Sequence, residues 1–106
     1  MDIKQVDLRE MELSAINTAD YNPRKDLKPE DKEYQRLKNS ILTYGMVDPL
    51  IYNENTGRLV GGHQRYKVLR DLGVEKAQVS VVHLNDKQEK DLNIRLNNVH
   101  GEFERD

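Results

Sequence analysis

The sequence of 106 residues contains no cysteine. This absence excludes disulfides, thiolate nucleophiles and cysteine metal sites, and it suits a reducing compartment. The sequence also has no apolar run long enough to span a membrane, and its first residues lack the basic-then-apolar order of a signal peptide. We therefore expect a cytoplasmic protein that does not interact with a membrane.

An excess of positive charge is also missing, because 17 Lys and Arg residues stand against 19 Asp and Glu residues. DNA-binding domains usually obtain most of their affinity from basic side chains that contact phosphates. The charge balance therefore predicts that DNA, if it is a partner, binds through a local patch, through a partner protein or, as we expect, through regions outside this chain. Apolar residues make up only 36% of the sequence, which indicates a single domain with a thin core.

The hydrophobic pattern and the turn residues predict alternating strands and helices. We expect a strand at 11–13, a helix at 29–44 that ends at Gly45, a hairpin of strands at 49–52 and 58–60, a helix at 63–72, a strand at 79–84, and a last helix that opens with a capping box at 86–89. Residues 1–10 are expected to form either a weak strand or a loose arm. The predicted fold class is α/β (α+β), a small mixed sheet with about three helices packed on it. The abrupt end of the sequence suggests a domain at 11–104 that was cut from a longer protein.

Helical spacing also predicts which side chains face the core. In the first helix these are Tyr34, Leu37, Ile41 and Tyr44, and in the last helix they are Leu92, Leu96 and Val99. Tyr21 and Tyr44 could alternatively stack on a nucleotide base.

The most informative segment, Gly61-Gly62-His63-Gln64-Arg65, lies between a predicted strand and a predicted helix. The two glycines let the backbone turn and approach a ligand closely, and the free N–H groups of the helix start favour an anion. His63 adds a donor whose charge depends on pH, and Arg65, which we expect to be exposed, adds a permanent planar cation. The alternative is a glycine turn kept for packing, with both side chains on the surface. The segment is not a P-loop, and it lacks the third glycine of a dinucleotide fingerprint.

Three blocks in this order resemble the ParB/sulfiredoxin superfamily, and within it the ParB-type N-terminal domains, which often carry the label ParB-like nuclease. The blocks are residues 22–24, 40–50 and 61–66, and the resemblance covers about residues 11–104. It implies a ParB/sulfiredoxin-like fold that binds a nucleoside triphosphate, CTP or ATP, with Mg²⁺. The nucleotide-binding residues that it implies are Asn22, Arg24, Gly45, Asp48, Pro49, Gly61, Gly62, His63, Gln64, Arg65, Asn97 and Asn98.

Two departures from the family pattern limit the chemistry. Sulfiredoxins place a catalytic cysteine in the Gly-Gly turn, where this chain has His63, so sulfinic-acid reduction is excluded. ParB members carry a Glu-Asn-x-x-Arg motif on the third helix, where this chain has Asn97 and Gly101 in place of the Glu and the Arg. Slow CTP hydrolysis of the ParB type is therefore in doubt. Residues 96–103 instead resemble phage or mobile-element ParB-like modules that are joined to DNA methyltransferases.

Three functions stay open. The first is a nucleotide-binding domain, able to form a homodimer, in a DNA-associated protein for chromosome or plasmid partition, DNA modification or a phage function. The second is a small kinase or NTPase of the serine-kinase branch, for which Glu30 and Asp31 are the candidate carboxylate bases. The third is a degenerate module for protein interaction or DNA tethering. The sequence shows neither metal-ligand spacing nor an acidic cluster that would support a nuclease.

Overall fold

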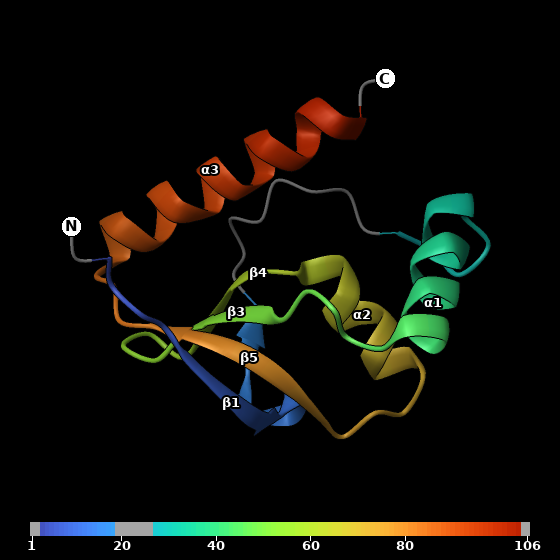
Figure 1. The fold of residues 1–106 in the computed structure, drawn as a ribbon, viewed down its shortest axis with the longest axis horizontal. Helices are drawn as coiled ribbons and strands as arrows, with labels where there is room; N and C mark the ends of the chain where they lie inside the picture. Colours follow the sequence, from blue (N-terminus) through green and yellow to red (C-terminus); the bar gives the residue numbers. More distant parts are fainter. Residues whose placement is uncertain (1–2, 19–26, 105–106) are drawn as a thin grey trace.

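The computed structural model describes residues 3–18 and 27–104, with side chains as far as Leu96 (Figure 1). The elements are β1 (Asp7–Glu12), the 3-10 turn η1 (Leu13–Ala15), β2 (Asn17–Thr18), α1 (Lys32–Tyr44), β3 (Leu50–Asn53), β4 (Arg58–Gly61), α2 (His63–Asp71), β5 (Lys76–Val82) and α3 (Asp86–Glu104). No helix within the described part of the chain is both long enough and apolar enough to cross a membrane.

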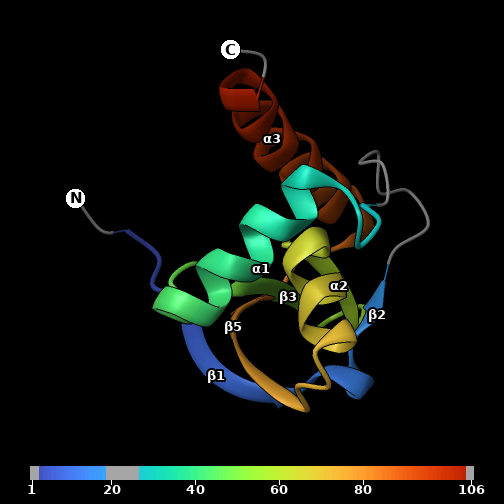
Figure 2. The same ribbon diagram turned by 90° about the vertical axis from the view of Figure 1, so that its right-hand side faces the viewer.

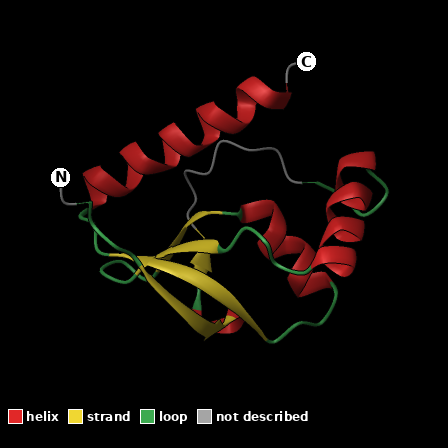
Figure 3. Cartoon of the chain, in the orientation of Figure 1, coloured by secondary structure: helices red, strands yellow, loops and turns green. Residues whose placement is uncertain are grey.

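The strands form one mixed sheet in the order β1-β5-β3-β4-β2. β3 runs parallel to β5 and antiparallel to β4, while β1 is antiparallel to β5. Helices α1 and α2 lie side by side at one end of the sheet, and α3 crosses above it (Figures 1 and 2). A mixed sheet with three α-helices is the predicted fold class, which is thereby confirmed (Figure 3).

The core lies between the sheet and the first two helices. Its buried apolar residues are Leu13, Ile16, Leu50, Tyr52, Leu59, Leu69, Ala77, Val79 and Val81. Tyr34 is buried where α1 meets α2, and its hydroxyl donates a hydrogen bond of 2.6 Å to the carboxylate of Asp71. That hydrogen bond, together with burial, raises the pKa of Tyr34 to about 12. The two helices are therefore joined by a polar contact as well as by apolar packing.

The predicted buried face of the first helix is only partly right. Tyr34 is buried, and Leu37 and Ile41 are half-buried, but Tyr44, the last residue of the helix, is 75% exposed. The helix also begins at Lys32, later than predicted. Asp31 lies at its N-cap position, but the Asp31 carboxylate accepts a hydrogen bond of 2.9 Å from the backbone N–H of Lys28 and not from the first turn of the helix.

The capping box of the last helix lies one residue earlier than predicted. Asn85 and Gln88 each accept, through the side-chain oxygen, a hydrogen bond from the backbone N–H of the other, at 2.8 and 3.0 Å. Because Gln88 completes the box, the Glu89 side chain can point into the protein interior, where it is fully buried.

The predicted apolar stripe of the last helix is also incomplete. The buried positions are Glu89 and Asn93, whereas Leu92 and Leu96 are only half-buried. Asn93 donates a hydrogen bond of 2.9 Å to the backbone carbonyl of Val60 in β4. The face of α3 that meets the sheet is therefore partly polar, and the side chain of Val99 lies beyond the described ones.

Only the last part of segment 1–10 forms a strand, one of the two predicted alternatives: residues 7–10 belong to β1, and residues 3–6 lie outside it. β1 pairs with β5 along its whole length, from Asp7 opposite Val81 to Glu12 opposite Lys76. Met11 packs against the core, while the side chain of Leu8 is exposed.

Candidate functional site

The glycine turn joins the end of β4 to the start of α2. Gly62 has a φ of 87°, in the left-handed region that glycine adopts without strain. A Cβ atom at this position would lie 2.8 Å from both the Nη2 atom of Arg65 and the Cδ2 atom of Leu50. Gly62 is therefore required both by the backbone and by the Arg65 side chain that folds back over it.

Gly61 has a packing role. A Cβ atom there would lie 3.1 Å from the Cδ1 atoms of both Ile51 and Leu96, so the missing side chain lets β3 and α3 approach the turn. The packing alternative thus holds for Gly61. The same contact places α3 beside the turn just before Asn97 and Asn98. Both of these lie in helical backbone, but their side chains are outside the described ones.

Arg65 is the main charged group of the turn. Its Nη2 atom donates a hydrogen bond of 3.3 Å to the carbonyl of Pro49, and its Nη1 atom lies 3.5 Å from the carboxylate of Asp48. The side chain is only 18% exposed, so the prediction of an exposed Arg65 was wrong. Burial lowers its pKa, and Asp48 opposes that shift. The buried Nε atom has no hydrogen-bond partner among the described residues, which leaves the cation only partly satisfied.

His63 is the second polar group of the turn. Burial lowers its pKa, a hydrogen bond with the Leu59 backbone opposes the shift, and the charge of Arg65 lowers the pKa further. His63 is therefore neutral near pH 7. Its Nε2 atom is buried and has no hydrogen-bond partner within the described part of the chain. The turn therefore holds two such buried nitrogen atoms, Nε2 of His63 and Nε of Arg65.

The low pKa of His63 predicts an acid-sensitive fold. As pH falls below 6.5, the unfolded chain protonates this histidine while the folded chain resists, so the free energy of unfolding decreases. We expect His63→Gln to lose less stability than the wild type between pH 7.5 and 5.5, measured by urea unfolding. The matched control His83→Gln removes an exposed histidine. Equal acid sensitivity in the wild type and His63→Gln would contradict this account of His63.

The segment before α1 reaches the start of α2. The backbone N–H of Leu27 lies 3.4 Å from the side-chain oxygen of Gln64, its hydrogen-bond acceptor. The predicted ligands Asn22 and Arg24, and Tyr21 with them, lie outside the described residues. The structure therefore brings Gln64 close to the loop that follows these residues in the sequence.

The other predicted site residues lie around α1. Gly45 ends α1 with a φ of 82°, and its N–H donates to the carbonyl of Ile41 at 2.8 Å. Glu30 is exposed, and the Asp31 carboxylate already accepts the Lys28 N–H. Within the described ranges, no three His, Asp or Glu side chains are grouped so that they could hold a metal ion.

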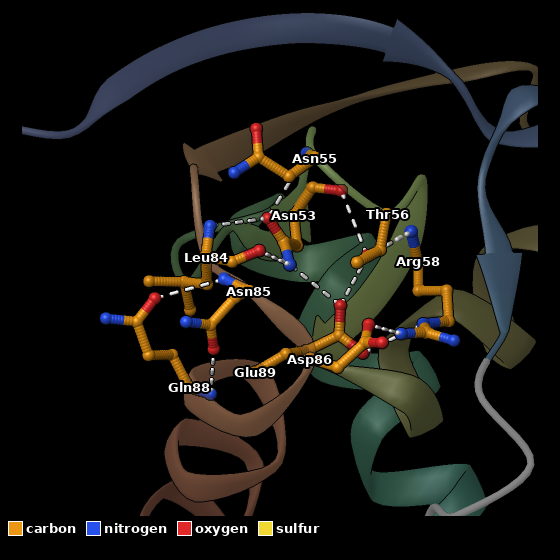
Figure 4. Close-up of polar contacts among 9 residues, drawn as sticks. All are labelled: Asn53, Asn55, Thr56, Arg58, Leu84, Asn85, Asp86, Gln88 and Glu89. Carbon is orange, nitrogen blue, oxygen red and sulfur yellow. Dashed lines mark hydrogen bonds and ion pairs between the residues drawn. The ribbon is translucent and has the colours of Figure 1, made fainter.

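Sequence reasoning missed a buried polar network between the β3–β4 hairpin and the start of α3 (Figure 4). The Glu89 carboxylate accepts hydrogen bonds from Asn53, at 2.8 Å, and from Thr56, and it pairs with the Nε atom of Arg58 at 2.9 Å. Asn53 also bonds both backbone groups of Leu84, at 2.9 and 3.0 Å. The network fixes α3 to the loop end of the β3–β4 hairpin. The glycine turn lies at the opposite end of β4.

The sequence matches a family of known proteins. The family model of the ParB N-terminal domain matches residues 1–98. The chain belongs to this family. It is 23% identical to the "Probable chromosome-partitioning protein ParB" of Pseudomonas putida, over 96% of this chain and 41% of that protein. The predicted membership of the ParB/sulfiredoxin superfamily is confirmed.

Two solved structures show the same fold. The first is the C-terminally truncated chromosome-partitioning protein ParB of Caulobacter crescentus complexed with CTP-gamma-S (TM-score 0.72, 21% identity, 86% of this chain and 52% of that chain). The second is the sulfiredoxin of Arabidopsis thaliana (TM-score 0.64, 19% identity, 80% of this chain and 94% of that chain). The chain thus spans less than half the length of the Pseudomonas relative and about half of the Caulobacter chain.

Proposed function

We propose that this ParB N-terminal domain binds a nucleoside triphosphate, with the phosphates on the turn from Gly61 to Arg65. The observation that carries the proposal is the buried, partly satisfied guanidinium of Arg65 beside the N-terminus of α2. A cation held out of water with an unpaired donor is costly unless an anion completes its hydrogen bonds. A phosphate at this position would also accept hydrogen bonds from the backbone N–H groups of the first turn, which have no partner within the helix itself.

The neighbouring groups fit the same ligand. Asp48 holds Arg65 only at 3.5 Å and is itself largely exposed, so a phosphate could replace it as the partner of the guanidinium. The Nε2 atom of His63 would donate to a phosphate oxygen once it is protonated, which the negative charge of the ligand favours. Mg²⁺ would arrive with the phosphates, since it commonly binds through phosphate oxygens and only one or two protein ligands.

The relatives support CTP as the nucleotide and a chromosome-partitioning setting. The Caulobacter protein was solved with CTP-gamma-S, and the Pseudomonas relative is named a chromosome-partitioning protein. In our proposal the nucleotide binds this domain, and DNA binds mainly through other parts of the protein, because the net charge of the chain is −2.

A thermal-shift screen with CTP, ATP, GTP and UTP, each with and without Mg²⁺, tests the proposal. A ligand that binds only the folded state raises the unfolding temperature. At a hundredfold excess over Kd, it adds about 2.7 kcal/mol to the free energy of unfolding. We expect one nucleotide, CTP or ATP, to give the largest shift and the corresponding nucleoside to give none. No shift with any triphosphate would contradict nucleotide binding and favour the degenerate module.

A binding module without hydrolysis is the second candidate. It is favoured by Asn97 and Gly101, which replace the Glu and the Arg of the ParB motif. The kinase alternative is weakened because the Asp31 carboxylate already accepts a hydrogen bond from the backbone N–H of Lys28. Release of inorganic phosphate during incubation with the nucleotide from the screen separates binding alone from turnover.

A further inference from the structure

The residue before the glycine turn, Val60, forms a β-bulge in β4. β3 pairs with β4 on both sides of this position, at Leu59 and at Gly61, so Val60 is an extra residue on its strand. β2 does not pair with Val60 either, because the described part of that strand ends opposite Leu59. A bulge disrupts the ladder locally, and Val60 is fully buried, so a donor from another element stabilises its backbone carbonyl.

That donor comes from α3. The side-chain amide of Asn93 donates a hydrogen bond of 2.9 Å to the carbonyl of Val60. Asn93 is only 2% exposed, and a buried amide is costly unless it is hydrogen-bonded. A helix position that faces a sheet is ordinarily apolar. The amide at this position therefore matches the carbonyl of the bulged residue.

Three contacts from one face of α3 follow β4 along its length. Glu89 pairs with the first residue of the strand, and Asn93 bonds the third. Leu96 lies against the last residue, Gly61, where a Cβ atom would be 3.1 Å from the Leu96 Cδ1 atom. Four helical residues rise about 6 Å and two strand residues about 6.6 Å, so helix and strand stay in step from Glu89 to Asn93. Among the described side chains of α3, Asn93 thus makes the polar contact nearest to the turn.

The orientation of the bulge sets the direction of the turn. The peptide group that follows Val60 opens the turn, so the chain enters it in the direction that this carbonyl allows. On the other side of Val60, the backbone of Leu59 is hydrogen-bonded to His63. Bulges beside functional sites commonly aim a side chain. Here the group that is aimed is the guanidinium of Arg65, which folds back over Gly62.

We infer that Asn93 is a positioning residue of the proposed nucleotide site. By holding the carbonyl of Val60, it fixes the bulge that directs the turn from Gly61 to Arg65 at the phosphates. The inference rests on the proposed function, since it requires phosphates bound at the turn. Because Asn93 is buried, it acts on the nucleotide through the preorganised turn. The alternative is that Asn93 contributes only to the stability of the fold.

Isothermal titration of Asn93→Leu with the nucleotide that gives the largest thermal shift tests this inference. Leu has nearly the size of Asn but lacks the donor. Residues that orient the ligands of a metal contribute about tenfold to a hundredfold to its affinity, and we expect a loss of about tenfold here. If urea unfolding shows that Asn93→Leu does not fold, Asn93→Ala takes its place with the same expected result.

The variant Tyr34→Phe is the matched control. It removes the hydrogen bond of another buried side chain, the one to Asp71 at the far end of α2 from the turn. Its affinity should stay within about twofold of the wild-type value, because the effects of distant sites are independent.

Amide hydrogen exchange in the free proteins separates positioning from a general loosening of the fold. Exchange at residues 61–65 should be faster in the Asn93 variant than in the wild type, and unchanged in Tyr34→Phe. Wild-type affinity in the Asn93 variant would overturn the inference and leave the proposed function standing. An equal loss of affinity in Tyr34→Phe, or weaker binding with unchanged exchange at the turn, would overturn it as well. If the wild type binds no triphosphate, the proposed function fails and the inference fails with it.

Discussion

Replacing Arg58 with Met should destabilise the protein by about 2–3 kcal/mol, because the fully buried carboxylate of Glu89 loses a charged partner that is itself 36% exposed. Glu89 has no exposed surface, and its carboxylate is paired with the Nε atom of Arg58 at 2.9 Å. Burial alone would lower the pKa of Arg58, but Glu89 and Asp86 together raise it, so the cation is held in place. Without Arg58 the buried carboxylate loses this charged partner, while the neutral donors Asn53 and Thr56 stay in place. Urea unfolding measures the loss.

The variant Asp86→Ala is the matched control. Asp86 contacts the same guanidinium at 2.6 Å, but its side chain is 75% exposed. Exposed ion pairs contribute about 0–1 kcal/mol, so this change should cost far less than Arg58→Met.

A double variant separates the ion pair from its surroundings. Arg58→Met combined with Glu89→Met removes both charges, so it should be more stable than Arg58→Met alone. If the double variant is less stable than the single one, the loss does not arise from an uncompensated charge at Glu89.

The network also shows where sequence reasoning stops. Helix and strand order followed from apolar spacing and turn residues, because those signals are local. Glu89 carries a local signal as well, since Glu89, Asn93 and Leu96 recur at helical spacing on one face. The sequence analysis instead assigns Glu89 to a capping box, because it lies three residues after Asp86. Only the position of Arg58, thirty-one residues away in the sequence, shows that the face is buried and charged.

The glycine turn was predicted for partly different reasons from those the structure shows. The left-handed Gly62 and the helix start at His63 follow from the sequence pattern. The burial of Arg65 does not, because it depends on the loop at Asp48 and Pro49 folding back beside the turn. No rule of spacing connects these residues, whereas resemblance to a family does group them.

Arg65→Ala should weaken nucleotide binding about thirtyfold to a thousandfold, or about 2–4 kcal/mol. If the phosphates bind at the turn, the guanidinium supplies charge-assisted hydrogen bonds from a position that is already ordered over Gly62. Arg65→Lys should rescue binding only in part, since an ammonium cannot form the planar, two-pronged contact. Isothermal titration of the three proteins, with the nucleotide that gives the largest thermal shift, measures the difference.

Because Arg65 is largely buried, its replacement also affects folding. The contacts with Pro49 and Asp48 are long, at 3.3 and 3.5 Å, so their loss should cost only about 1 kcal/mol, which urea unfolding of the free protein measures separately. Arg70→Ala is the matched control, because it removes the same charge from the exposed last turn of the same helix. Affinity should then fall with Arg65→Ala and stay near the wild-type value with Arg70→Ala. An equal loss in both variants would mean that only the net charge of α2 attracts the nucleotide, and unchanged affinity in Arg65→Ala would place the phosphates elsewhere.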